Sequence, residues 1–214
     1  MVQIPFEAIL FDNDGALVDS HVLVDVAWRQ LAREFDLDYG VLEKQLIGVP
    51  AADTLGRHLD GEQLTQAIAR LEDLEVEVAF DTPPMPGAIE LTSSLPDNAW
   101  AVATSATRRL ANARWAGAGI TPPPATITAD DITHGKPHPE PFLNAARLLS
   151  IDPERCIVLE DSPSGGIAAN KSGATVIAVG DQEWTVAPTA RVPDLTSLSV
   201  ITSDDGSLVL HIED

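Results

Sequence analysis

Two aspartates, Asp12 and Asp14, follow a short apolar run and precede Gly15. On an extended backbone, residues two apart project to the same side, so these carboxylates would share one small space while Asn13 points away. Such a pair is costly without a cation, and hard oxygen ligands favour Mg2+ over zinc. Gly15 permits a tight turn in which backbone N–H groups approach an anion. Taken alone, the pattern fits a strand-end turn with two solvated acids better than it fits an active site.

Polar residues follow apolar runs at further places in the chain. Thr104 and Ser105 offer a hydroxyl and N–H groups that suit either a phosphate contact or an ordinary helix N-cap. Lys136, one of three lysines, stands in the rigid sequence Gly-Lys-Pro, where a surface lysine is the simplest interpretation. Glu160 and Asp161 come directly after a run of four apolar residues. A metal ion would account for acids at the edge of a core.

Together these residue types predict phosphoryl transfer by position and charge. Asp12 would attack phosphorus in line, while a metal ion, Lys136 and backbone amides neutralise the phosphoryl oxygens. Asp14 would protonate the departing alkoxide and then activate the water that hydrolyses the acyl phosphate. Lys136 would also balance the acidic cluster. The predicted phosphate-binding residues are Asn13, Thr104, Ser105 and Lys136.

The elements that must position these residues alternate between strands and helices. Buried strands are predicted at 8–11, 100–103, 156–159 and 175–179. Helices are predicted at 88–95, 108–115, 141–149 and 165–171. This alternation indicates an α/β fold with a parallel sheet covered on both faces. In such sheets the chemistry lies at the carboxyl ends of the strands, where the polar residues fall.

The stretch 17–82 breaks this alternation and has helical periodicity throughout. It predicts a helical cap domain inserted after the first strand, with residues 1–16 and 83–214 forming a discontinuous core. The acidic run 72–77 is interpreted as the solvated face of a cap helix. Alternating apolar residues at 208, 210 and 212 predict a terminal strand at a sheet edge.

Composition narrows the classes of partner. The formal net charge of −20 opposes binding to nucleic acid, and no apolar run is long enough for a membrane span. Cys156 is the only cysteine, so no internal disulfide forms, and its apolar neighbours predict a buried thiol. The first ten residues lack the pattern of a secretory signal, and we therefore expect a cytoplasmic protein.

On its motifs the chain resembles the phosphatases of the haloacid dehalogenase superfamily, in particular the bacterial sugar and polyol phosphate phosphatases of the phosphoglucomutase-like group. The motifs that carry the resemblance are the segment 12–15, Thr104–Ser105, Lys136 and Glu160–Asp161, in that order. The resemblance implies a Rossmann-like core under a mobile cap. It implies Asp12 as nucleophile, Asp14 as acid and base, and Mg2+ held by Asp12, the main-chain oxygen of Asp14 and Asp161, with Glu160 nearby.

Two features bear on rate and specificity. Ala16 stands where members of this family usually carry Thr or Val. The cap residues that could contact substrate are His21, the apolar turn that contains Gly48 and Val49, and Arg57. The apolar turn favours a small phosphorylated metabolite, such as a hexitol phosphate, a sugar phosphate or glycerol 3-phosphate.

Other functions remain open at this point. A phosphoglucomutase-type isomerase would also use Asp12, although the apolar turn argues against tight binding of a sugar phosphate by the cap. A dehalogenase would leave Asp14 without a role. A signalling receiver has no helical insertion, and a non-catalytic metabolite-binding relative would keep the fold without turnover. Oligomeric state, whether monomer or homodimer, is left open.

Overall fold

The computed structural model describes residues 2–43, 51–203 and 205–213. Its centre is a six-stranded sheet of order β4-β3-β2-β5-β6-β7, in which every neighbouring pair is parallel. The strands are β2 (Ala8–Phe11), β3 (Trp100–Ala103), β4 (Thr126–Ile127), β5 (Cys156–Glu160), β6 (Thr175–Val179) and β7 (Ala190–Val192). The predicted α/β fold with a parallel sheet is therefore confirmed.

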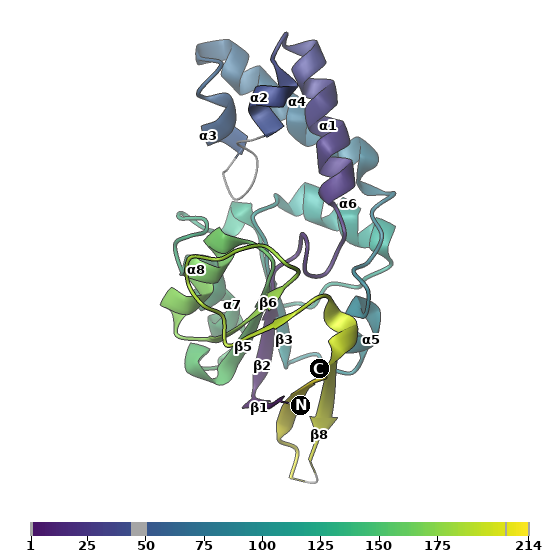
Figure 1. Cartoon of the computed structure of the whole chain (residues 1–214), viewed down its shortest axis with the longest axis vertical. Coiled ribbons are helices and arrows are strands. Elements are labelled where there is room, and N and C mark those ends of the chain that lie inside the picture. Colours follow the sequence, from purple (N-terminus) through teal and green to yellow (C-terminus); the bar gives the residue numbers. More distant parts are fainter. Residues whose placement is uncertain (1, 44–50, 204, 214) are drawn as a thin grey trace.

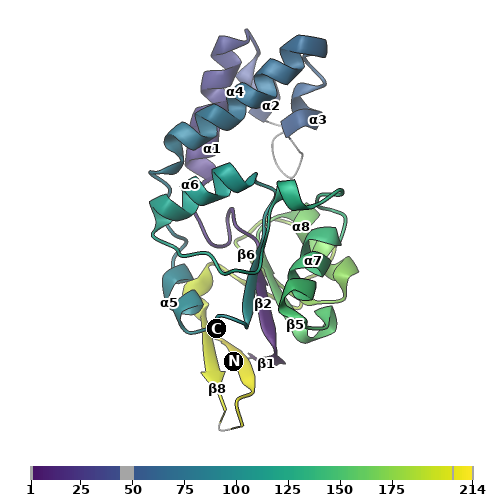
Figure 2. The same cartoon turned by 180° about the vertical axis from the view of Figure 1, so that it is seen from behind.

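Helices cover both faces of this sheet (Figures 1 and 2). Strand β2 alternates: Ala8 and Leu10 pack into one apolar cluster with α7 (Glu140–Leu149) and α8 (Pro163–Ser172). Ile9 and Phe11 pack into the opposite cluster with α5 (Ala88–Ser93) and α6 (Arg108–Ala118). Because both faces of the strand are buried, it reads as a continuous apolar run. The structure confirms the four predicted core helices, with shifts at their ends.

A second, antiparallel sheet joins the two ends of the chain. It contains β1 (Val2–Phe6), β9 (Leu208–Ile212) and β8 (Leu198–Thr202), in the order β1-β9-β8. The prediction of an edge strand at 208–212 is wrong, because β9 is the central strand of this small sheet. Leu208, Leu210 and Ile212 are its buried face, which is the source of the alternation. Pairing between distant segments leaves no local signal.

In the part of the chain that the structure describes, four helices follow the first core strand: α1 (His21–Glu34), α2 (Tyr39–Leu42), α3 (Ala51–Leu55) and α4 (Gly61–Ala79). They share a separate apolar cluster that includes Trp28, Leu31 and Leu71 and lie together beyond α6 (Figure 1). The prediction that 17–82 is helical throughout is wrong at its start, where Val18 forms isolated bridges with Asp14 and Pro84. The exact domain division at 17–82 stays a prediction.

The prediction that the acidic run is a solvated face of α4 holds for part of it: the side chains of Asp73 and Glu77 are 48% and 61% exposed, whereas that of Glu75 is only 16% exposed. Three residues of the run contact α6: Glu72 accepts a hydrogen bond from the Thr107 hydroxyl at 2.6 Å, Asp73 pairs with Arg109 at 2.6 Å, and Glu75 pairs with Arg114 at 3.4 Å. Figure 2 shows α4 crossing above α6. The acidic run therefore connects the cap helix α4 to the core helix α6.

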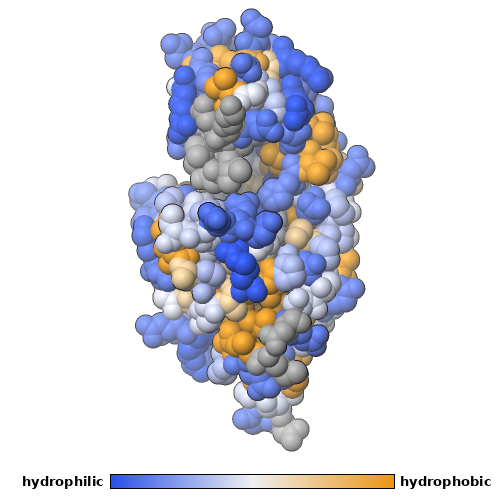
Figure 3. All heavy atoms as spheres, viewed as in Figure 1, coloured by the Kyte–Doolittle hydropathy of each residue, from blue (hydrophilic) through white to orange (hydrophobic). Residues whose placement is uncertain are grey.

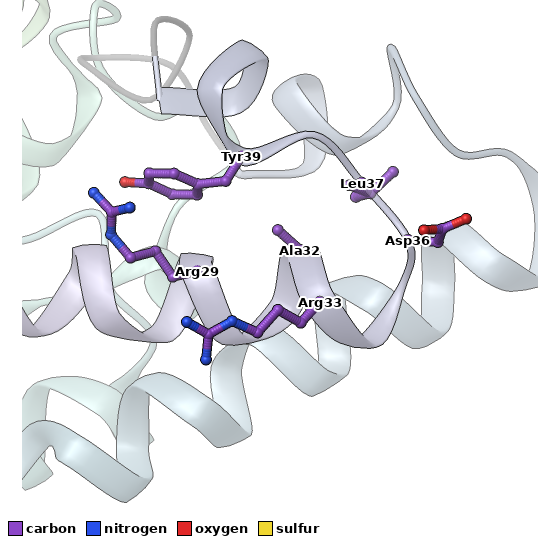
Figure 4. Close-up of a pocket in the computed structure, with 6 residues that line it drawn as sticks. All are labelled: Arg29, Ala32, Arg33, Asp36, Leu37 and Tyr39. Carbon is purple, nitrogen blue, oxygen red and sulfur yellow. The ribbon is translucent and has the colours of Figure 1, made fainter.

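The surface is largely hydrophilic on the face shown in Figure 3, where apolar residues are scattered between the hydrophilic side chains. A hollow of ≈ 220 Å³ opens on the cap between α1 and α2, lined by polar and apolar residues (Figure 4). Among the described residues, no helix is both long enough and apolar enough to cross a bilayer.

Candidate active site

Three carboxylates converge where neighbouring strands end. Asp12 follows β2, Glu160 is the last residue of β5, and Asp161 comes next. Because β2 and β5 are adjacent and parallel, their carboxyl ends meet at one edge of the sheet. One ligand oxygen from each residue lies within 4.8 Å of the others, and all three residues are buried. The structure thus brings together these predicted site residues.

Lys136 supplies a cation inside this cluster. Its side chain, only 5% exposed, reaches from the loop before α7 so that Nζ contacts Asp12 Oδ1 and lies 2.8 Å from Glu160 Oε2. Burial lowers the pKa of Lys136, but the charges of Asp12 and Glu160 outweigh it, so the pKa lies above its usual value. The ammonium group stays charged. Lys136 thus contacts two of the three acids, and its role in balancing them stays a prediction.

The cluster still carries excess negative charge. With all three carboxylates ionised, the single ammonium of Lys136 leaves a formal charge of −2, before the contact of His21 with Asp161 is counted. Burial and then the charge of Glu160 raise the pKa of Asp12 well above its usual value, although Lys136 opposes them. Burial also raises the pKa of Asp161 to about 6. A divalent cation would relieve both effects, and this all-oxygen donor set suits Mg2+.

Small residues make room for these carboxylates. Gly15 has a φ of 81°, and a Cβ atom there would lie 2.3 Å from Asp161 Oδ2. A Cβ on Gly165 would lie 2.0 Å from the Glu160 carboxylate. Glu160 Oε1 is held further by Ser162, whose backbone N–H donates at 2.9 Å and whose hydroxyl donates at 2.7 Å. Neither glycine position therefore tolerates a side chain without displacing an acid.

Asp14 lies beside this cluster and has its own set of donors. Its Oδ1 accepts from the Ser20 hydroxyl at 2.6 Å and pairs with Arg114 Nη1 at 2.8 Å. Its Oδ2 accepts from Asn13 Nδ2 at 3.2 Å. Asn13 does not point away as predicted, because its buried side chain lies between Asp14 and Trp115, whose Nε1 donates to Asn13 Oδ1 at 2.7 Å. Its backbone N–H remains the predicted phosphate contact.

Sequence reasoning missed Ser20, Arg114 and Trp115. The available signal was the position of Arg114 within α6, between the buried residues Ala113 and Trp115. A charged residue in the buried stripe of a helix needs a partner, because an unpaired buried charge is costly. That partner could not be identified from spacing.

Thr104 and Ser105 follow β3, the strand on the other side of β2. Thr104 is buried, and its Oγ1 accepts from the backbone N–H of Ala106 at 3.0 Å. Its own N–H donates to Ile127 O at 3.0 Å, so the prediction of a free N–H is wrong at Thr104. The N-cap of α6 is Thr107. The Thr104 hydroxyl is therefore not used as a helix cap.

The cap candidates are placed differently from one another. His21 begins α1, and its Nε2 lies 3.3 Å from Asp161 Oδ2, a hydrogen bond that raises the pKa of His21. Arg57 is exposed in the turn after α3. Gly48 and Val49 lie outside the described residues. Ala16 is fully buried. His21 is thus the predicted cap residue seen in contact with the acidic cluster.

A second group with metal-ligand chemistry consists of His134 and His138, on the loop that carries Lys136, and Glu140, the first residue of α7. Both histidines are exposed. Glu140 already accepts from the backbone N–H groups of Thr133 at 2.8 Å and His134 at 3.0 Å. The Glu140 carboxylate, in the first turn of α7, therefore holds the loop that carries Lys136 through these hydrogen bonds.

Comparison with known proteins agrees with this arrangement. Residues 6–173 match the family model described as haloacid dehalogenase-like hydrolase. Hexitol phosphatase A of Escherichia coli strain K12 is 35% identical over 81% of this chain and 82% of the relative. Glycerol-1-phosphate phosphohydrolase 2 of Saccharomyces cerevisiae is 31% identical over 80% of this chain and 74% of the relative. A solved HAD hydrolase of Entamoeba histolytica has a TM-score of 0.80, covering 90% of this chain and 95% of that one, and at 22% identity it supports the fold alone.

Proposed function

Because the chain belongs to the haloacid dehalogenase-like hydrolase family, we propose that it hydrolyses phosphate monoesters through a phosphoryl group carried on Asp12. One observation carries the proposal. The carboxylates of Asp12, Glu160 and Asp161 and the ammonium of Lys136 meet in a buried cluster at the carboxyl end of the sheet. That combination suits in-line transfer of an anionic group, because a carboxylate nucleophile stands beside a fixed positive charge.

The acidic cluster fits a magnesium ion. Asp12, Asp161 and the main-chain oxygen of Asp14 would hold it, with Glu160 nearby. When bound, Mg2+ would neutralise charge on the phosphoryl oxygens. The unbalanced charge of the cluster and the raised pKa values of Asp12 and Asp161 support this assignment.

The protein's own side chains account for the two chemical steps. A carboxylate oxygen of Asp12 attacks phosphorus and forms the acyl phosphate while the ester oxygen leaves. Asp14 gives its proton to that oxygen, so the alcohol departs neutral. Asp14 then takes a proton from water, which attacks phosphorus and frees Asp12. Lys136, the Thr104 hydroxyl and the backbone amides of Asn13 and Ser105 would stabilise the phosphoryl oxygens.

For the substrate we propose a small sugar or polyol phosphate, which would be the protein's principal partner. The support is the set of relatives: two that each align over about four fifths of this chain are named for a hexitol phosphate and for glycerol 1-phosphate. The strong negative net charge fits a small ligand held by local cations better than a polyanion.

Phosphate release from a panel of esters tests this function. The panel runs from glycerol 1-phosphate and glycerol 3-phosphate to hexitol phosphates, with isomer formation followed in parallel. We expect release of inorganic phosphate that a chelator removes and added Mg2+ restores. Asp12→Asn should abolish turnover, whereas Asp97→Asn, at an exposed turn, should leave it unchanged. Turnover retained by Asp12→Asn, or isomer formed in place of phosphate, would contradict the proposal.

A further inference from the structure

A buried arginine, Arg114, forms an ion pair with Asp14, the second aspartate of the first motif. Arg114 on α6 has a side chain only 6% exposed, and its Nη1 lies 2.8 Å from Asp14 Oδ1. Its Nη2 lies 3.4 Å from Glu75 Oε1 on the cap helix α4. One guanidinium group thus joins the proposed acid and base to the cap. The planar fork of arginine suits this bridge, because its nitrogens hold two acceptors in a fixed relation.

Asn13, next to Asp12, donates to Oδ2 of Asp14, but the two partners of its Oδ1 come from the junction with the cap. Ser20 stands immediately before the first cap helix, and Arg114 belongs to the helix that α4 crosses. These two groups donate to the same oxygen of Asp14. The orientation of the carboxylate is therefore set where cap and core meet.

Glu75 completes the bridge from the cap side. Its side chain is 16% exposed, and burial raises its pKa to about 7 although Arg114 opposes the change. A carboxylate so placed is costly unless a cation faces it. Other α4 to α6 contacts, such as Asp73 to Arg109, are largely exposed, with side-chain exposures of 48% and 55%. Of these two ion pairs between α4 and α6, the one between Glu75 and Arg114 is buried on the arginine side and nearly so on the carboxylate side.

We propose that Arg114 is a positioning residue that orients Asp14 for proton transfer, and that Glu75 ties this orientation to the cap. The inference rests on the proposed function. Removing Arg114 leaves Asp14 held by the weaker neutral donors Ser20 and Asn13, and it leaves Glu75 without its cation. The charge cluster of Asp12, Glu160 and Lys136 does not contact Arg114 and keeps its geometry. Phosphoryl transfer from an ester whose leaving group needs a proton should therefore slow more than transfer from an ester whose leaving group needs none.

Comparing kcat/KM for esters with different leaving groups separates these two cases. The value of kcat/KM reports events up to the first irreversible step, here the transfer to Asp12. An alkyl phosphate must receive a proton on its departing oxygen, whereas the nitrophenolate of p-nitrophenyl phosphate leaves without one. We expect Arg114→Ala to lower kcat/KM for glycerol 1-phosphate or a hexitol phosphate by roughly 10- to 100-fold. For p-nitrophenyl phosphate the change should stay within roughly 3-fold.

Matched variants complete the experiment. Arg109→Ala removes a cation from the same helix and a contact to the same cap helix, yet it does not touch Asp14, so it should leave the ratio of the two kcat/KM values unchanged. Arg114→Lys, which keeps the charge without the fork, should give an intermediate ratio. Glu75→Gln should change the ratio in the same direction as Arg114→Ala, by less. Circular dichroism and thermal melting verify folding, and Arg114→Lys and Glu75→Gln carry the test if Arg114→Ala does not fold.

Each outcome has a distinct meaning. A selective loss with the alkyl ester supports the inference. An equal loss with both esters, or none with either, in folded variants of an active enzyme overturns the positioning role and leaves the proposed function standing. Absence of turnover by the unsubstituted protein with every ester overturns the proposed function, and the inference falls with it.

Discussion

Lys136 and Arg114 are two buried cations, and each joins one aspartate of the pair Asp12 and Asp14 to a second carboxylate. Lys136 joins Asp12 to Glu160, and both acids stand at the ends of neighbouring core strands. Arg114 joins Asp14 to Glu75, which lies on a cap helix. The two aspartates are separated by one residue, yet their partners come from different layers of the molecule.

This difference assigns different mechanical roles to the two acids. The proposed nucleophile, Asp12, obtains a fixed position from adjacent strands whose backbones are hydrogen bonded. The proposed acid and base, Asp14, is held by groups at the cap junction. In the proposed reaction a compact ammonium suits the first task because it would also face the phosphoryl group. A forked guanidinium suits the second because it links two elements.

Removing the first cation should have the largest effect. Lys136→Met keeps the length of the side chain but leaves two buried carboxylates without their partner. We expect phosphate release to fall by about 100- to 1000-fold. The free energy of unfolding, measured by urea titration with chelator present, should fall by about 3–5 kcal/mol.

The control is Lys171→Met, at an exposed lysine whose Nζ lies 3.4 Å from the Pro137 carbonyl oxygen. It should behave like the unsubstituted protein. Activity retained by Lys136→Met would contradict the role given to Lys136, because this cation would then be dispensable.

Replacing the cap-side acid should have a smaller, pH-dependent effect. The pKa of Glu75 rises from 4.5 to about 7 on folding. A raised carboxyl pKa gives a contribution to stability that is fully present below the unfolded value and is lost as pH rises through the folded value. The unsubstituted protein should therefore lose stability between pH 4.5 and 7 through this group.

Glu75→Gln removes that loss while keeping the shape of the side chain. The two proteins should be similarly stable at pH 4, and at pH 8 the variant should be more stable by up to about 3 kcal/mol. Urea titrations at several pH values measure this difference. Asp12 and Asp161 also have raised pKa values, but their contributions to the free energy of unfolding cancel because both proteins contain them. The charged groups that act on Glu75 are Arg114, Asp14 and Glu72. A difference in stability that does not vary with pH would contradict the assignment.

The contrast between the two cations also explains what could be predicted from the sequence. Asp12, Thr104 and the pair Glu160–Asp161 were identifiable because buried parallel strands leave continuous apolar runs, and the residues after them must meet at one edge. Lys136 was identified by its Gly-Lys-Pro sequence and by the scarcity of lysines. Arg114 and Glu75 have no such marker, since a charged residue on a helix faces solvent unless tertiary packing buries it. Glu75, within the acidic run of α4, was misinterpreted for that reason.

The small sheet shows the same limit. Strands β1 and β9 come from opposite ends of the chain, and their pairing depends on where the core places those ends. The alternation of β9 indicated a strand, but it carried no information about its neighbours. Local patterns thus predicted the elements, and long-range pairing decided which of them met.

The smallest expected effect lies at Asn13, the residue between the two aspartates. Trp115→Phe keeps most of the ring volume but removes the N–H that donates to Asn13 Oδ1 at 2.7 Å, leaving a buried acceptor without its partner. Such a change costs about 1–3 kcal/mol in the free energy of unfolding, measurable by urea titration. Asn13 also donates to Asp14, so kcat/KM for an alkyl phosphate should fall slightly more than that for p-nitrophenyl phosphate. A larger loss of activity than that caused by Arg114→Ala would show that Asn13, rather than the arginine bridge, holds Asp14 in place.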